Sequence, residues 1–264
     1  MKMNSKNVTL LTDFGTEDGY VGAIKGVLLS GMPDVRISDI SHRIQPFNIR
    51  QAAFALLNYY ADFPAGTVHL LIIDPGVGTS RKGIIVRTNR HYFICPDNGV
   101  LSYVLEREVF EAFRIKEKLF GESISPTFHG RDIFAPAAIK ILSGEAIDTF
   151  AEKTADLISF YRHFEKISET ELRLQIAHVD HFGNLILNFT REDWEKMGEP
   201  ENVKIQLEHG FLHGIRKTFG STGVKELVTT WDSCGFLQIA QNKGNAAQML
   251  QKKVGDQLIL KIGK

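Results

Sequence analysis

The chain has 264 residues, which suits one large domain or two ordinary ones. Its hydrophobic share of 43% and charged share of 23% are typical of globular proteins, so disorder is not expected. Lys and Arg together number 31, as do Asp and Glu. Because nucleic-acid and anionic-membrane surfaces need a basic excess, this balance argues against both partners.

The two cysteines, Cys95 and Cys234, lie far apart and form no CxxC motif, which predicts neither a disulfide framework nor a structural zinc site. Residues 1–11 do not resemble a signal peptide. No run of about 18 apolar residues occurs, so no membrane-spanning helix is predicted. We therefore expect a cytoplasmic protein.

The first part of the chain alternates buried-strand and helix patterns. Helical periodicity occurs at 20–28 and 49–60, and the apolar runs expected to be strands are 8–12, 35–40, 68–73, 83–88 and 91–95. This alternation predicts an α/β fold with a mostly parallel sheet flanked by helices. Ligands bind such sheets at the carboxyl ends of strands, where Asp13 and Asp74 are expected.

The pattern changes near residue 165. Short strands separated by turns are predicted at 172–179, 185–189, 203–207, 227–231, 236–240 and 257–262. They indicate a small antiparallel β-barrel or sandwich, of which we expect the barrel. We expect an α/β domain at 1–160, a barrel domain at 170–264, and a linker near 155–170.

Three familiar motifs are excluded. Asp13-Phe14-Gly15 spells the magnesium-binding tripeptide of kinases, but no glycine-rich loop or lysine strand precedes it. Gly76-Val77-Gly78 lacks the glycine spacing of a dinucleotide loop and the ending of a P-loop. No histidine pair at helical spacing accompanies a carboxylate, so no metal and no cofactor are predicted.

The remaining candidates are polar residues at expected strand ends. They are Asp13, Asp18, Asp74, Arg81, Asp97, Asn98, His129, Arg131 and Asp132. Each also fits a cap, turn or surface charge; Asp97-Asn98-Gly99 fits a turn and helix N-cap best. Spacing alone leaves catalytic and structural roles equally open for Asp74 and His129.

Six segments, occurring in order, identify a family resemblance. They are TDFGTED (12–18), IDPGVGTSR (73–81), PDNG (96–99), FHGRD (128–132), DHFGN (180–184) and NKGNAA (242–247). Together they resemble the S-adenosyl-L-methionine hydroxide adenosyltransferases, which are related to fluorinase and chlorinase. The resemblance covers nearly the whole chain. It implies an α/β domain followed by a β-barrel, and a homotrimer whose active sites lie between subunits.

The resemblance also implies residue roles. Asp74, Arg81 and His129 match the family's water-activating set, and the expected reaction is hydrolysis of S-adenosyl-L-methionine to adenosine and methionine. The expected substrate-binding residues are Asp13 at the ribose hydroxyls, Asp18 and Asp180 near the methionine ammonium, Ser233 at the amino-acid end, Phe47, Phe182 and Phe219 around adenine, and Asn184 at its edge. Cys234 stands where fluorinase has an arginine, so recognition of the methionine carboxylate does not carry over.

This chemistry is physically reasonable. A sulfonium is already a good leaving group, so the main task is to orient a water molecule and accept its proton. We expect Arg81 to hold Asp74 ionised; whether Asp74 or His129 accepts the proton stays open.

Three alternatives remain. A halogenase is disfavoured by the carboxylate of Asp74, by Gly130 where fluorinase has a serine, and by the short turn at 88–91. A non-catalytic S-adenosylmethionine or nucleoside-binding regulator would not need the Asp74, Arg81 and His129 set. A metal-dependent nucleotide hydrolase using Asp13, Asp18 and Asp74 would be sensitive to chelators.

Overall fold

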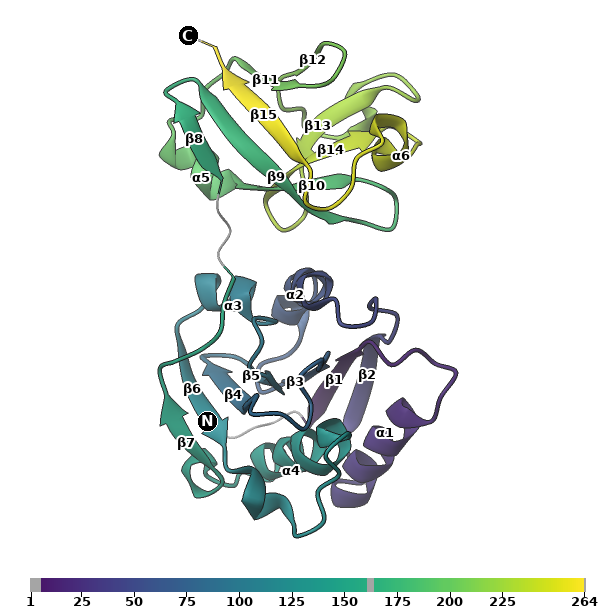
Figure 1. Cartoon of the computed structure of the whole chain (residues 1–264), viewed down its shortest axis with the longest axis vertical. Helices are drawn as coiled ribbons and strands as arrows, with labels where there is room; N and C mark the ends of the chain where they lie inside the picture. Colours follow the sequence, from purple (N-terminus) through teal and green to yellow (C-terminus); the bar gives the residue numbers. More distant parts are fainter. Residues whose placement is uncertain (1–5, 161–163, 264) are drawn as a thin grey trace. The chain divides into compact units, whose positions relative to one another are not determined.

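The computed structural model describes residues 6–160 and 164–263. The chain forms two compact units, divided after Phe160 (Figure 1). Strand β8 (Glu165–Ser168) belongs to the second unit, so it occupies part of the region where we expected a linker. Within these described residues, no helix is both long and apolar enough to cross a membrane.

The first unit contains one sheet and the helices that cover it. Its strands are β1 (Asn7–Thr12), β2 (Arg36–Ser41), β3 (Val68–Ile72), β4 (Gly83–Thr88), β5 (Tyr92–Pro96), β6 (Phe110–Ile115) and β7 (Ala151–Thr154). Its α-helices are α1 (Tyr20–Gly31), α2 (Ile49–Leu57), α3 (Ser102–Arg107) and α4 (Ala135–Leu142). Single turns of 3₁₀-helix are η1 (Tyr60–Asp62), η2 (Glu117–Phe120) and η4 (Ile147–Thr149), and η3 (Gly130–Phe134) is a π-helix.

The seven strands follow the order β2-β1-β3-β5-β4-β6-β7. The pairs β1–β2, β1–β3 and β3–β5 are parallel, whereas β4–β5, β4–β6 and β6–β7 are antiparallel. The predicted α/β fold is therefore confirmed, with a mixed sheet whose parallel half carries β1 and β3. The turn between β4 and β5 is too short for a crossover helix, which is why these strands pair antiparallel.

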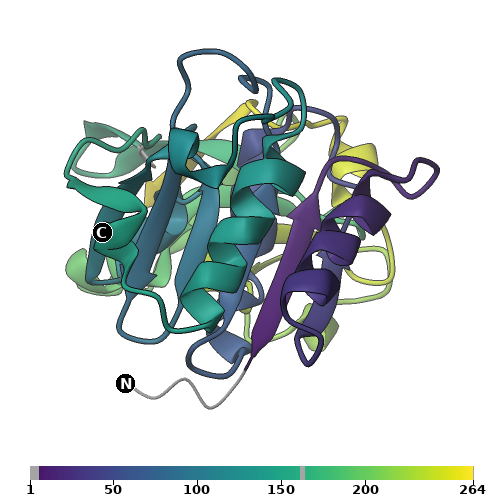
Figure 2. The ribbon, with the colours of Figure 1, turned by 90° about the horizontal axis from the view of Figure 1, so that it is seen from below.

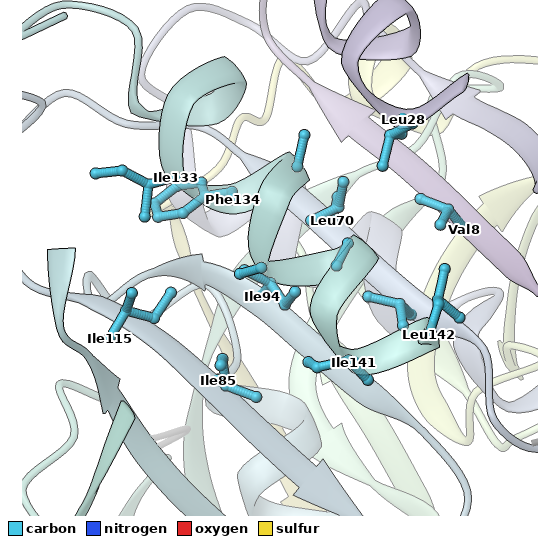
Figure 3. Packing of buried hydrophobic residues seen from close by; sticks show 14 of the residues in the cluster. Val8, Leu28, Leu70, Ile85, Ile94, Ile115, Ile133, Phe134, Ile141 and Leu142 are labelled. Atoms are coloured by element: carbon cyan, nitrogen blue, oxygen red, sulfur yellow. The ribbon is translucent and has the colours of Figure 1, made fainter. Parts of the chain in front are cut away.

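Helices cover both faces of this sheet. Figure 2 shows α1 and α4 on one face, and in Figure 1 α2 and α3 lie on the other. On the first face, Val8, Leu70 and Ile94 from β1, β3 and β5 pack against Leu28 of α1 and Ile141 of α4 (Figure 3). Burial on both faces explains the nearly continuous apolar runs of the central strands.

The second unit is a strongly curved antiparallel sheet. Besides β8, its strands are β9 (Glu171–Val179), β10 (Leu185–Thr190), β11 (Val203–Gln206), β12 (Phe211–His213), β13 (Leu227–Trp231), β14 (Phe236–Gln241) and β15 (Gln257–Ile262). Its helices are α5 (Arg191–Lys196), α6 (Ala246–Leu250) and the 3₁₀ turn η5 (Phe219–Ser221). The eight strands follow the order β12-β11-β15-β9-β10-β14-β13, with β8 paired to β9. A bridge between Arg216 and Thr230 nearly closes this sheet into the predicted barrel.

Candidate active site

A cleft of about 250 Å³ lies at the carboxyl ends of β1 and β3. The register pairs Thr12 with Ile72, so the two strands end side by side. Asp13 directly follows β1, and Asp74 follows β3 by two residues. Both carboxylates line the cleft, together with His129. The topology therefore brings together polar residues that are far apart in the sequence.

Asp74, Arg81 and His129 form one hydrogen-bonded cluster. Arg81 Nε donates to Asp74 Oδ1 at 3.0 Å, and Arg81 Nη2 donates to Asp74 Oδ2. The same Nη2 lies 3.1 Å from His129 Nδ1. The side chains of Asp74 and Arg81 are each only 7% exposed, and His129 is buried. A bidentate pair of this kind fixes the plane of the carboxylate.

The electrostatic balance at Asp74 differs from our expectation. Burial raises the pKa of Asp74 above its ordinary value, and this effect outweighs the opposing influence of Arg81 and His129. Removal from water disfavours a charged carboxylate, whereas a neighbouring cation favours it. Arg81 therefore orients the Asp74 carboxylate, but its charge does not bring the pKa of Asp74 below the ordinary value.

His129 precedes an irregular helix. The π-helix η3 begins at Gly130 and continues into α4. A Cβ atom at Gly130 would lie 3.0 Å from Ile72 Cδ1 at the end of β3, so a larger residue would require the Ile72 side chain to shift. π-Helical turns are rare and occur frequently at functional sites. Here the turn holds His129 beside the end of β3.

The Asp13 carboxylate binds the backbone of Phe47, a residue with a strained conformation. Its Oδ2 accepts a hydrogen bond from the backbone N–H of Phe47 at 2.8 Å. Phe47 has a φ of 66°, a left-handed conformation that bulky residues rarely adopt. The Phe47 ring lines the cleft and is 68% exposed. Burial raises the pKa of Asp13, although the Phe47 hydrogen bond partly offsets this.

The barrel unit has a pocket of its own, of about 590 Å³. The five residues expected in this unit all line it: Asp180, Phe182, Asn184, Phe219 and Ser233. Phe182 is 71% exposed and Phe219 is 44% exposed. Large exposed aromatic rings around a pocket are typical of a binding surface.

Asp180 organises the loop of this pocket. Its Oδ1 accepts hydrogen bonds from the backbone N–H groups of Phe182 and Asn184, at 2.9 and 2.8 Å. Its Oδ2 accepts from Asn184 Nδ2 at 2.7 Å. Because a carboxylate only accepts here, the Asn184 amide must present its NH₂ group to Asp180. This orientation leaves Oδ1 as the acceptor of the Asn184 amide.

Some expected site residues do not join these clefts. Asp18 is exposed in the turn before α1 and does not line the cleft at β1 and β3. Asp132 pairs with Arg131 and accepts from the Ser125 backbone N–H.

The Asp97-Asn98-Gly99 segment forms a turn. Asn98 Oδ1 accepts from the Val100 N–H at 3.2 Å, and Asp97 Oδ1 accepts from the Ile158 N–H at 2.9 Å. The N-cap of α3 is Leu101, with no side-chain cap, so the N-cap interpretation of this segment was wrong.

Sequence reasoning missed other residues that line the clefts. They include Phe14, Val77 and Phe128 in the first unit, and Trp231, Gln238 and Lys243 in the barrel. Phe14 and Phe128 lie within two of the segments that carry the family resemblance, but we assigned neither of them a role from the sequence. In the parts of the chain that the structure describes, no group of three or more His, Cys, Asp or Glu side chains is arranged to hold a metal ion.

Comparison with known proteins gives a consistent result. The model of the S-adenosylmethionine hydroxide adenosyltransferase N-terminal domain matches residues 8–151, and that of the C-terminal domain matches residues 174–259. A Methanocaldococcus jannaschii protein named (R)-S-adenosyl-L-methionine hydrolase is 35% identical over 95% of this chain and 94% of its own length. A Thermus thermophilus protein of the same name is 31% identical over 94% of this chain and 96% of its own.

Two further similarities extend this picture. The fluorinase of Nocardia brasiliensis is 26% identical over 97% of each chain. The crystal structure of an uncharacterized conserved protein from Thermotoga maritima has a TM-score of 0.85 and 35% identity, and the match covers 96% of this chain and 99% of that one.

Proposed function

Because the chain belongs to the S-adenosylmethionine hydroxide adenosyltransferase family, we propose that it hydrolyses S-adenosyl-L-methionine to adenosine and L-methionine. The observation that carries the proposal is the buried cluster of Asp74, Arg81 and His129 at the edge of the cleft. The relatives named (R)-S-adenosyl-L-methionine hydrolase support it, and we propose the (R) sulfonium epimer as the substrate.

In the proposed reaction a water oxygen attacks the ribose C5′ in line with the C5′–S bond. The bond to C5′ forms as the C5′–S bond breaks, and its electron pair stays on sulfur, giving the neutral thioether of methionine. The water loses one proton, which the protein must accept. Holding the water in line is the larger contribution, since orientation of reactants can supply several orders of magnitude in rate.

The hydrogen bonds of Arg81 favour Asp74 as the proton acceptor. Arginine only donates, so His129 Nδ1 at 3.1 Å must accept, and the proton of the neutral ring is on Nε2. His129 then has no free nitrogen lone pair for the water's proton. Asp74 keeps unused lone pairs beyond its two bonds to Arg81, and burial makes it more basic. We therefore assign proton acceptance to Asp74 and orientation of the water to His129 Nε2–H.

The barrel pocket is proposed to bind the adenosyl end. Phe182 and Phe219 offer exposed rings for stacking on adenine, and Asn184 Oδ1 can accept a hydrogen bond from the exocyclic amine. Asp13 is proposed to hold the ribose hydroxyls. Because these groups lie on different units, we propose that the complete site forms between subunits of a homotrimer.

The proposal is tested by incubating the protein with each sulfonium epimer of S-adenosyl-L-methionine in oxygen-18 water and analysing the products by mass spectrometry. We expect adenosine carrying the label at its 5′ oxygen, from the (R) epimer and without added metal or halide. A halide-dependent 5′-halo-adenosine would indicate the halogenase instead, although the Asp74 carboxylate should repel an anion. Unlabelled adenosine, or activity abolished by EDTA, would contradict the hydrolytic mechanism.

A further inference from the structure

Arg81 has donors that its two known partners do not use. Of the five N–H groups of a guanidinium, Nε–H and one hydrogen of Nη2 face Asp74, and the other hydrogen of Nη2 faces His129. Within residues 6–160 and 164–263, Nη1 is buried and has no hydrogen-bond partner. A buried donor without a partner costs about 1–3 kcal/mol, so it requires an explanation.

The atom that faces Nη1 is a carboxylate oxygen of Glu117, which is also buried without a hydrogen-bond partner among the residues that the structure describes. This oxygen, Glu117 Oε1, lies 3.9 Å from Arg81 Nη1. The separation is too long for a hydrogen bond and too short for a bridging water molecule. A shift of less than about 1 Å would pair the two atoms at normal hydrogen-bond length.

The sheet brings these two residues together. Arg81 lies two residues before the first residue of β4, Glu117 follows β6 as the first residue of η2, and β4 and β6 are paired. The Phe134 ring lies 5.5 Å from the Arg81 guanidinium. A Cβ atom at Gly83 would come within 2.8 Å of that ring and 3.7 Å of Glu117 Oε1, so the absence of a side chain at Gly83 leaves space for both groups beside the start of β4.

Glu117 also separates the cluster from solvent. Its side chain is 32% exposed, whereas that of Arg81 is 7% exposed. Glu117 and His129 both line a second cavity, distinct from the cleft that contains Asp13 and Asp74. Without the Glu117 carboxylate, water from this cavity would reach Nη1 and compete for the guanidinium.

We propose that Glu117 is a positioning residue, and this inference rests on the proposed hydrolysis. Its carboxylate holds Arg81 Nη1, which fixes the guanidinium plane so that Nε and Nη2 stay directed at Asp74 and His129. A bidentate geometry tolerates little rotation. Glu117 therefore acts on the reacting water through Arg81.

The test compares variants at this position. Glu117→Ala is expected to lower kcat about tenfold with an unchanged KM, because misorientation affects the chemical step and not substrate binding. Glu117→Gln keeps an acceptor oxygen and should recover activity to within about threefold of the native protein. Glu122→Ala is the matched control, because Glu122 lines the same cavity and has no interaction with Arg81; its kcat should stay native.

A double-mutant cycle distinguishes positioning from a general structural effect. Lysine has no counterpart of Nη1, so in an Arg81→Lys background Glu117→Ala should change kcat by less than about twofold. An equal loss in both backgrounds, or native kcat in Glu117→Ala, would overturn the proposal.

A readout without turnover separates this inference from the proposed function. Nitrogen-15 NMR of the Arg81 side chain should show hindered rotation about Cζ–Nη1 in the native protein and free rotation in Glu117→Ala. Unchanged rotation would refute the Glu117 contact, whatever the enzymatic activity. Failure of the native protein to hydrolyse S-adenosylmethionine, with the rotational difference present, would refute the proposed function alone.

Discussion

Burial and the charge of Arg81 have opposite effects on the pKa of Asp74, and the resulting raised pKa suits a proton acceptor. Burial raises its pKa, and Arg81 holds it in a fixed plane. A carboxylate paired with arginine at the surface would be a weaker base, while one buried alone would be protonated at neutral pH. Basicity and orientation thus come from different parts of the same cluster.

We predict that Asp74→Asn separates turnover from binding. The amide has nearly the same shape but cannot accept the proton of the water, so kcat should fall about a hundredfold or more. The affinity for S-adenosylmethionine, measured by calorimetry, should stay close to native, since the lost interaction belongs to the transition state.

Asp13→Ala should give the opposite pattern. This change removes the proposed partner of the ribose hydroxyls and the acceptor of the Phe47 N–H, so binding should weaken markedly. Both variants must first be shown to be folded and to have the native oligomeric state. If Asp74→Asn lost binding and turnover together, as Asp13→Ala should, our assignment of Asp74 to the water would be incorrect.

A buried histidine pair predicts how stability depends on pH. The rings of His69 and His91 lie 5.0 Å apart and are almost completely buried. Burial lowers the pKa of His91 to about 4 and that of His69 well below its ordinary value. The unfolded chain takes up these protons near pH 6.5, before the folded chain does. The free energy of unfolding should therefore be constant above about pH 6.5 and fall as the pH decreases toward about 4.

The measurement is urea unfolding at pH 7.5 and pH 5. For His91 alone, we expect the free energy of unfolding to be about 2 kcal/mol lower at pH 5 than at pH 7.5. The variant His91→Phe removes this titration, so its stability should decrease less over the same interval. An equal decrease in the two proteins would show that His91 is not responsible.

At the scale of elements, the loop between β9 and β10 depends on a close contact with the start of α6. Gly183 has a φ of 82°, and a Cβ there would overlap the side chain of Asn245. Asn245 caps α6 by accepting from the Gln248 N–H at 2.8 Å. This contact supports the loop that carries Phe182 and Asn184.

We predict that Gly183→Ala destabilises the barrel by about 2–4 kcal/mol, through backbone strain and overlap together. Gly198→Ala is the control, because Gly198 has a φ of 80° and open space around its Cα, so it reports the strain alone. Thermal unfolding of both variants measures the difference. Equal destabilisation would mean that the contact with Asn245 is not important.

The elements also show what the sequence could and could not predict. Asp13 and Asp74 were found because apolar runs ending in an acidic turn mark the carboxyl ends of parallel strands. Strands β6 and β7 were missed because their alternation is weak and polar residues face solvent at this edge of the sheet. Glu117 follows β6, so no local pattern could place it beside Arg81; only the pairing of β4 with β6 does.

At the scale of the whole molecule, the proposed site is divided between the two units. The cleft of about 250 Å³ is lined by Asp74 and His129 of the cluster proposed to activate water, while the pocket of about 590 Å³ is lined by the groups proposed to bind adenine. Neither contains both sets of groups. If the site forms between subunits, each chain contributes its α/β unit to one site and its barrel to another.

Mixing two inactive variants tests this arrangement. A chain with Asp74→Asn keeps a functional barrel, and a chain with Asn184→Ala keeps a functional cluster. In a cyclic trimer, every mixed assembly contains one site in which a functional cluster meets a functional barrel. Random assembly at equal concentrations gives about three quarters mixed trimers, and each of these has one functional site of three. About one quarter of native activity should therefore be restored.

Co-refolding the chains, followed by sedimentation and an adenosine assay, gives the measurement. Each variant refolded alone should stay inactive, and a mixture that also stayed inactive would place both halves of the site within one chain.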